Sequence, residues 1–183
     1  MKIRDGVLML LIVMMLIGCA VKRPLMPTPN LYAAGQQELF TNISPKFKTN
    51  RVDLFFVTDR SPEQDDNGNL VYGFGRSDSA AFGLATVEIG ENVSWQTLRD
   101  NSLRRQRSER LELRMGTIVE HGRFPPTPLP FQSHGGFVTY DPAALAEVQA
   151  METRAWTELS RRLALTPRKE VLIYVHGYNN TFN

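Results

Sequence analysis

Three consecutive residues near the C-terminal end of the sequence, His176-Gly177-Tyr178, have the types that oxyanion chemistry needs, and they directly follow the apolar run Val171–Val175. Acyl transfer builds negative charge on the former carbonyl oxygen, and backbone N–H groups must be aimed at that oxygen beforehand. Glycine lets the chain turn sharply and approach a substrate without a side chain in the way. The pattern predicts one half of an oxyanion hole. A second interpretation stays open: a buried strand that ends in a glycine turn with a hydrogen-bonded histidine.

Other residues with chemical potential lack the spacing that a site requires. Ser133-His134-Gly135-Gly136 imitates an oxyanion loop, but a proline-rich stretch precedes it, so we expect a flexible turn. Ser77 comes nearest to a G-x-S-x-G nucleophile, but the closing glycine is missing, and we expect a loop serine. The three histidines are far apart and predict no metal site: His121, His134 and His176.

The single cysteine, Cys19, follows Gly18 at the end of the apolar run Val7–Ile17, with Lys2 and Arg4 before the run. The run is too short for a spanning helix, which needs about 20 apolar residues, and its flanks are those of a signal peptide. The order Leu-Ile-Gly-Cys resembles the lipobox of bacterial lipoproteins. This resemblance implies cleavage before the cysteine and diacylglycerol on its thiol. An ordinary secretory signal is the alternative, although it leaves a lone exported thiol unexplained.

These features divide the chain into three parts. Residues 1–18 are the predicted lipoprotein signal peptide, 19–50 the lipidated N-terminus with a proline-rich tether, and 51–183 the folded body. The expected partner is membrane lipid through Cys19, which places the protein in the cell envelope. Ala20 after the cysteine, rather than Asp, favours the outer membrane if the bacterium has two.

Composition and charge indicate no strongly charged partner for the chain as a whole. The 183 residues carry a net charge of +2, so neither a nucleic acid nor another polyion is indicated. Arginines are dense between Arg99 and Arg114, and three acidic residues offset them. A nucleic-acid patch is one interpretation of this stretch. For an exported lipoprotein, we expect a solvated surface segment instead. Such a segment could face anionic lipid headgroups.

Local patterns predict the elements of the body. Strands are expected at Val52–Thr58, Phe82–Ile89, Leu111–Val119 and Glu170–Val175, with loops at 63–69 and 125–130. The first of these strands is expected to end in the polar residues 59–62, where Asp59 and Arg60 anchor it. A helix is expected to begin at Asp141-Pro142 and to end at Thr166-Pro167, with apolar residues at helical spacing. The continuous apolar run of the last strand is typical of a strand buried on both faces, as in a parallel sheet with helices on either side.

Four stretches occur in a fixed order: VDLFFVTDR (52–60), YGFGRS (72–77), GLATVEI (83–89) and VLIYVHGYNNTF (171–182). In these motifs the chain resembles a family of bacterial α/β-hydrolases of the esterase or lipase type. The resemblance implies an α/β fold, here the N-terminal part of an α/β-hydrolase-type sheet with flanking helices. It also implies an oxyanion-hole role for His176, Gly177 and Tyr178, no cofactor, and a small acyl substrate for the complete protein.

The sequence departs from that family in one respect, because it contains no G-x-S-x-G and ends at Asn183. The serine, the acid and the histidine of such enzymes follow the oxyanion loop in chain order. We therefore expect these 183 residues to be a truncated hydrolase that lacks its nucleophile and is inactive. The alternative is a non-catalytic envelope lipoprotein with an α/β-hydrolase-like fold.

The first prediction concerns the lipid anchor. We expect the mature protein to begin at Cys19 and to carry lipid there, because a short apolar run ends in the Leu-Ile-Gly-Cys order. Mass spectrometry of the purified mature protein should find a lipid-modified N-terminal cysteine. A processed, soluble protein with a free Cys19 thiol would contradict the prediction.

Overall fold

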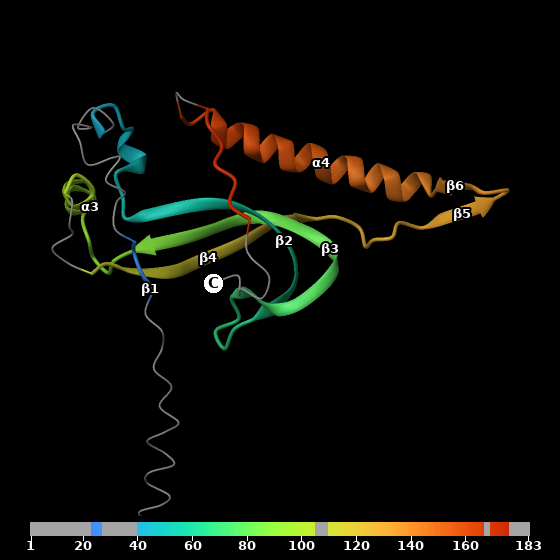
Figure 1. Cartoon of the computed structure of the whole chain (residues 1–183), viewed down its shortest axis with the longest axis horizontal. Helices are drawn as coiled ribbons and strands as arrows, with labels where there is room; N and C mark the ends of the chain where they lie inside the picture. Colours follow the sequence, from blue (N-terminus) through green and yellow to red (C-terminus); the bar gives the residue numbers. More distant parts are fainter. Residues whose placement is uncertain (1–22, 27–39, 105–109, 167–168, 176–183) are drawn as a thin grey trace, which may run out of the picture.

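The computed structural model describes residues 23–26, 40–104, 110–166 and 169–175. Two antiparallel sheets and two α-helices form this part of the chain (Figure 1). The larger sheet has the order β1-β4-β3-β2, with bounds β1 Arg23–Pro24, β2 Arg51–Gln64, β3 Leu70–Ile89 and β4 Glu112–Arg123. The other elements are the 3₁₀ helix η2 (Pro45–Phe47), α3 (Trp95–Ser102), β5 (Phe131–His134), β6 (Phe137–Tyr140) and α4 (Pro142–Leu163).

The β2–β3 hairpin is long and bends over one face of its own sheet (Figure 1). Its turn forms where Asp65 accepts hydrogen bonds from the backbone N–H groups of Asn67 and Asn69, and Gly68 takes a φ of +77° that glycine tolerates. Register shifts on either side of Arg60 interrupt the ladder, and such bulges increase the local bend and twist. The curled end of the hairpin therefore covers the sheet from which it starts.

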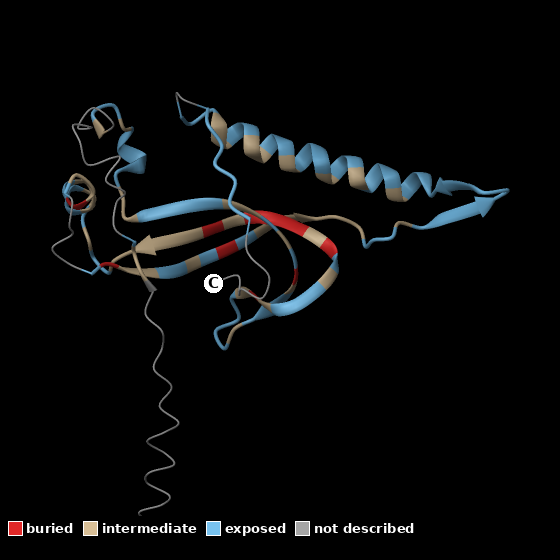
Figure 2. Cartoon of the chain, in the orientation of Figure 1, coloured by how far each residue is buried: buried red, intermediate tan, exposed pale blue. Residues whose placement is uncertain are grey.

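The core lies inside this curl. Tyr72 is 1% exposed and clusters with Ala85 and Ile118, and Phe56 and Leu70 pack against them. Figure 2 shows that the buried residues gather along the sheet, whereas the helix α4 and the β5–β6 hairpin are exposed or intermediate. The packing of strand on strand is thus the main source of apolar burial in the described residues.

The opposite face of the sheet carries Phe82, whose ring centroid lies 6.1 Å from that of Phe55 and 6.0 Å from that of Phe124. Helix α4 approaches this face: the guanidinium of Arg162 donates to the carbonyl oxygen of Asp53 at 2.8 Å. None of the helix residues is buried. The helix therefore covers this face, where Phe82 is 0% exposed, without burying a whole residue of its own.

Helix α4 begins where the sequence predicts. The carboxylate of Asp141 accepts hydrogen bonds from the backbone N–H groups of Ala143 and Ala144, and Pro142 occupies the first turn, so the N-cap prediction is confirmed. The helix ends at Leu163, three residues before Thr166. The predicted strands Val52–Thr58 and Phe82–Ile89 are confirmed as parts of β2 and β3.

The expected α/β fold class is wrong for the described residues. Every strand pair recorded there is antiparallel, and the chain is β-rich rather than a parallel sheet with flanking helices. The predicted last strand, Glu170–Val175, is also wrong: residues 169–175 have no secondary structure, and Leu172 is 96% exposed. A strand buried on both faces needs neighbours at its edges and cover above and below, and no described strand pairs with this segment.

The first strand also extends further than its sequence indicates. The strand is expected to end in the polar residues 59–62, before a loop at 63–69, yet β2 continues to Gln64. Arg60 pairs with Arg76, and Pro62 pairs with Tyr72, across the bulged part of the hairpin. The long partner strand β3 keeps this polar stretch extended, which overrides its turn-like composition.

The second prediction tests the close strand approach at Gly83. A Cβ there would meet the carbonyl oxygen of Val119 and would lie 3.0 Å from both Cα of Glu120 and the ring of Phe56. We expect Gly83→Ala to lower the free energy of unfolding by about 3 kcal/mol or more, since backbone atoms cannot move aside cheaply. Thermal and urea unfolding measure the change.

Gly75→Ala is the matched control, because its nearest atoms belong to the Ser61 side chain at 3.3–3.4 Å. We expect the control to change stability by about 0.5 kcal/mol or less. Equal stability of the Gly83→Ala variant and the natural protein would contradict the pairing of β3 with β4.

Candidate functional site

The residues that carried the sequence-based site prediction lie outside the described residues. These are the lipid-attachment residue Cys19 and the oxyanion-loop residues His176, Gly177 and Tyr178. Their roles stay predictions. The segment that leads into the loop is described, and its side chains are 54–96% exposed from Val171 to Val175.

The weaker candidates occupy positions without catalytic geometry. Ser77 lies within β3 rather than in the expected loop, and its hydroxyl accepts a hydrogen bond from the backbone N–H of Ser79 at 3.1 Å. The turn expected at 133–136 is confirmed in part: Gly135 and Gly136 join β5 to β6 with φ values of +58° and +86°, whereas Ser133 and His134 are the last residues of β5. No hydrogen bond recorded for the described serines joins one of them to a histidine.

The most closely connected polar cluster lies between β3 and β4. The hydroxyl of Tyr72 donates a short hydrogen bond to the carboxylate of Glu120. The same carboxylate accepts hydrogen bonds from Nε of Arg123 at 3.0 Å and from its Nη2 at 2.7 Å. Nη1 of Arg123 donates to the carbonyl oxygen of Ser79 at 3.1 Å. Every member thus has a partner, as buried polar groups require.

Mutual contact fixes the protonation states of this cluster. Burial and then the neighbouring Glu120 raise the pKa of the Tyr72 hydroxyl. Burial on its own would raise the pKa of Glu120, but hydrogen bonds from Arg123 and Tyr72 and the Arg123 charge hold that pKa below its ordinary value. Near neutral pH the tyrosine stays protonated and the glutamate ionised, so neither is poised to exchange a proton. The cluster is structural.

A second group of polar side chains lies where α4 passes β4. The carboxylate of Glu158 accepts two hydrogen bonds from Arg161, at 2.9 and 2.6 Å, and this pairing lowers the pKa of the Glu158 carboxyl. Nδ1 of His121 is 3.9 Å from Oε2 of Glu158, beyond hydrogen-bond distance. The two hydrogen bonds lie within α4, and no recorded contact brings a hydroxyl nucleophile to the histidine.

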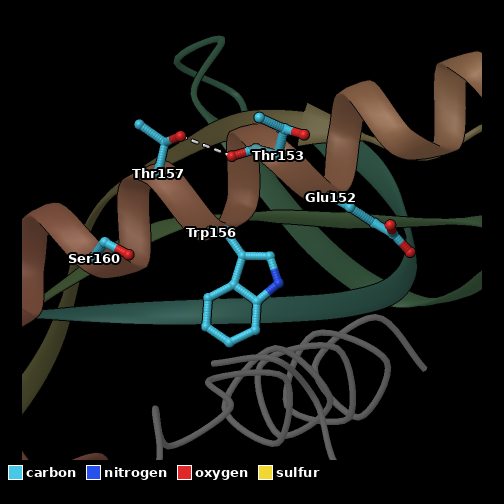
Figure 3. Close-up of a pocket in the computed structure, with 5 residues that line it drawn as sticks. All are labelled: Glu152, Thr153, Trp156, Thr157 and Ser160. Carbon is cyan, nitrogen blue, oxygen red and sulfur yellow. Dashed lines mark hydrogen bonds between the residues drawn. The ribbon is translucent and has the colours of Figure 1, made fainter.

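One shallow depression follows the outer surface of α4 (Figure 3). Its lining residues all come from that helix: Glu152, Thr153, Trp156, Thr157 and Ser160. The hydroxyl of Thr157 donates to the carbonyl oxygen of Thr153 at 2.8 Å, so the helix backbone already binds it. Trp156 is 67% exposed. The depression offers a contact surface but no acid, base and nucleophile in mutual reach.

Comparisons with known proteins found no matching family model, no matching curated protein and no matching solved structure. Among the described residues, no group of three or more His, Cys, Asp or Glu side chains could hold a metal ion. A search of the same part of the chain for a helix long and apolar enough to span a membrane found none.

Sequence reasoning missed the Tyr72–Glu120–Arg123 cluster. Tyr72 stands in the motif YGFGRS, which by itself indicates no polar partner. Glu120 and Arg123 lie just beyond the predicted third strand. The available signal was a tyrosine in a strand, which buries its ring and then needs a partner for its hydroxyl. That signal does not show which residue is the partner, and Glu120 lies 48 residues further along the chain.

The third prediction uses the lowered pKa of Glu120. Because its folded-state pKa lies below the ordinary value of 4.5, the ionised carboxylate stabilises the fold above that value and loses this contribution as pH falls through the folded-state pKa. We expect Glu120→Gln to lower the free energy of unfolding by about 1.5–3 kcal/mol at neutral pH. The difference from the natural protein should shrink under acid conditions.

Chemical unfolding across the acid range measures this effect. Glu152→Gln is the matched control, because Glu152 is exposed on α4 and belongs to no recorded ion pair among the described residues. A constant Glu120→Gln effect at every pH would show that the carboxylate charge does not stabilise the cluster.

Proposed function

We propose that this chain is part of a membrane-tethered serine hydrolase that cleaves carboxylic esters or related acyl bonds. Lipid on Cys19 holds it to the membrane, and the His176-Gly177-Tyr178 loop supplies backbone donors to the oxyanion. The observation that carries the proposal is a sequence motif, the apolar run from Val171 to Val175 that leads directly into His-Gly. The order of four family-like motifs along the body supports it.

In the proposed enzyme, the described sheet and the catalytic residues lie in different parts of the chain. The sheet holds its polar groups in closed pairs, as in the Tyr72–Glu120–Arg123 cluster, so it serves as scaffold. The sequence has no G-x-S-x-G. The nucleophile, the acid and the base are therefore assigned to polypeptide that follows the oxyanion loop, in the chain order typical of such enzymes.

The exposed apolar segment before the loop is consistent with this assignment. Leu172, Ile173 and Val175 are 80–96% exposed, and contiguous apolar surface of this kind usually marks an interaction site. Further polypeptide of the same enzyme would cover this segment and hold the adjoining loop in place. Backbone donors stabilise an oxyanion only when they are held in advance.

A second candidate is a non-catalytic lipoprotein of the cell envelope. One observation favours it: among the described residues, no recorded contact joins a serine hydroxyl to a histidine base. In this alternative the body is a binding component. The sequence motif at the oxyanion loop then has a structural role only.

The fourth prediction concerns activity. Residues 19–183 should show no esterase activity, because backbone donors cannot themselves attack a carbonyl. A longer product with a downstream G-x-S-x-G should hydrolyse short acyl esters and react with a serine-directed phosphonate. In that product, Gly177→Val should lower kcat by about 10²–10³-fold, the effect of losing one oxyanion donor.

Ser77→Ala is the matched control and should leave the turnover of the longer product unchanged. The Ser77 hydroxyl accepts a hydrogen bond from the backbone N–H of Ser79 within β3. Stoichiometric phosphonate labelling of residues 19–183 that Ser77→Ala abolishes would place the nucleophile elsewhere than proposed. A longer product without any hydrolase activity would favour the binding component.

A further inference from the structure

One end of the large sheet carries β1 and α3 (Figure 1), and basic side chains contact aromatic rings there. We propose that this end is a membrane-docking face that binds anionic phospholipid headgroups. The face comprises Lys46, Lys48, Trp95, Arg99, Arg104 and Arg110. The inference rests on the lipid tether of the proposed function and adds the surface that the tether brings to the bilayer.

The link from Cys19 to the sheet is short because β1, which lies inside the predicted segment 19–50, pairs with β4. Arg23 pairs with Leu113 and Pro24 with Glu112, and the backbone N–H of Leu25 donates to the carbonyl oxygen of Leu111 at 2.7 Å. Four residue steps separate Cys19 from Arg23, and these can span at most about 14 Å. A lipid on Cys19 thus keeps Arg23 within that distance of the membrane surface, and the start of β4 is the strand beside it.

Aromatic rings and cations are stacked at the same end. Nζ of Lys48 lies 5.5 Å from the ring centroid of Trp95, and the guanidinium carbon of Arg99 lies 5.6 Å from it. The ring of Phe40 meets Trp95 edge-on at 6.3 Å. Nζ of Lys46 is 5.0 Å from the Phe47 ring. Tryptophan beside basic residues is typical of the headgroup level of membranes, where one part of the surface is apolar and the other wet.

The charge of this end is complementary to anionic lipid. Between residues 46–51 and 88–114, the described side chains comprise seven basic and four acidic ones. Three of the basic side chains pair with acidic ones: Arg51 with Glu88, Arg99 with Asp100 and Arg114 with Glu91. The other four form no recorded salt bridge with a described carboxylate: Lys46, Lys48, Arg104 and Arg110. Each is exposed and free to meet a headgroup phosphate.

The two tryptophans make the inference testable in the full chain. Trp156→Phe leaves Trp95 as the only indole, and Trp95→Phe leaves Trp156 on α4. Each lipidated protein is reconstituted into vesicles of brominated phosphatidylcholine, with or without phosphatidylglycerol, and its fluorescence is recorded. We expect bromine to quench Trp95 more strongly than Trp156, and the excess to require phosphatidylglycerol and to decline with added salt.

A charge variant tests the electrostatic part. In the Trp156→Phe background, Lys46→Gln with Lys48→Gln should lower the ratio of docked to undocked protein about thirtyfold, which is five- to sixfold for each lysine. The matched control is Arg154→Gln with Lys169→Gln, two exposed basic residues outside the face, and it should leave the quenching unchanged. Circular dichroism confirms that both double variants are folded.

The outcomes separate docking from tethering. Lipid on Cys19 with equal quenching of the two tryptophans would overturn the docking face and leave the tether intact. Quenching of Trp95 in a protein without lipid on Cys19 would keep the face and overturn the tether. A shift of Trp95 fluorescence with a single-stranded oligonucleotide, and none with anionic vesicles, would assign the face to nucleic acid and overturn the proposal.

Discussion

The burial of Tyr72 inside the bent β2–β3 hairpin is the interaction on which the rest of the sheet depends. The ring is 1% exposed, meets Phe56 at a centroid distance of 5.6 Å and packs with Ala85 and Ile118. Full burial of one large apolar side chain contributes about 1.5–3 kcal/mol. A ring buried this deeply brings its hydroxyl with it, and the hydroxyl must find an acceptor. Glu120 on the neighbouring strand is that acceptor.

One buried hydroxyl therefore determines a chain of further contacts. An ionised Glu120 beside the core needs a cation, which Arg123 provides through two hydrogen bonds. The third contact of Arg123 reaches the backbone of Ser79, so the cluster joins β3 to β4 at two positions, Tyr72 and Ser79. The curl of the hairpin and the pairing of its strands stabilise each other through this cluster.

The remaining elements are attached to the sheet more loosely, and this separates scaffold from interaction surfaces. Helix α4 contributes no buried residue, and the β5–β6 hairpin exposes Phe137 at 79%. At one end of the sheet the chain presents basic and aromatic side chains, and beyond α4 it presents the apolar segment Val171–Val175. Both surfaces have the character of places that other molecules or further polypeptide would cover.

The sequence by itself determined the features that short-range chemistry controls. Asp141 and Pro142 begin α4 as expected, Gly68 allows the turn after β2, and alternating β-branched and aromatic residues mark the strands. The signal-like N-terminus and the His176 loop are also sequence features, and they stay predictions. Each of these signals acts within a few residues, so neighbouring positions suffice to indicate it.

Only the tertiary structure decided how the strands associate. The antiparallel order, the extension of β2 through a polar stretch and the Tyr72–Glu120–Arg123 cluster all depend on partners far along the chain. The apolar run Val171–Val175 shows the same limit, because its composition indicates a buried strand while no described strand pairs with it. Composition sets what a segment is able to bury. Its neighbours in space decide whether it is buried, because strand pairing and apolar cover are properties of two surfaces rather than one.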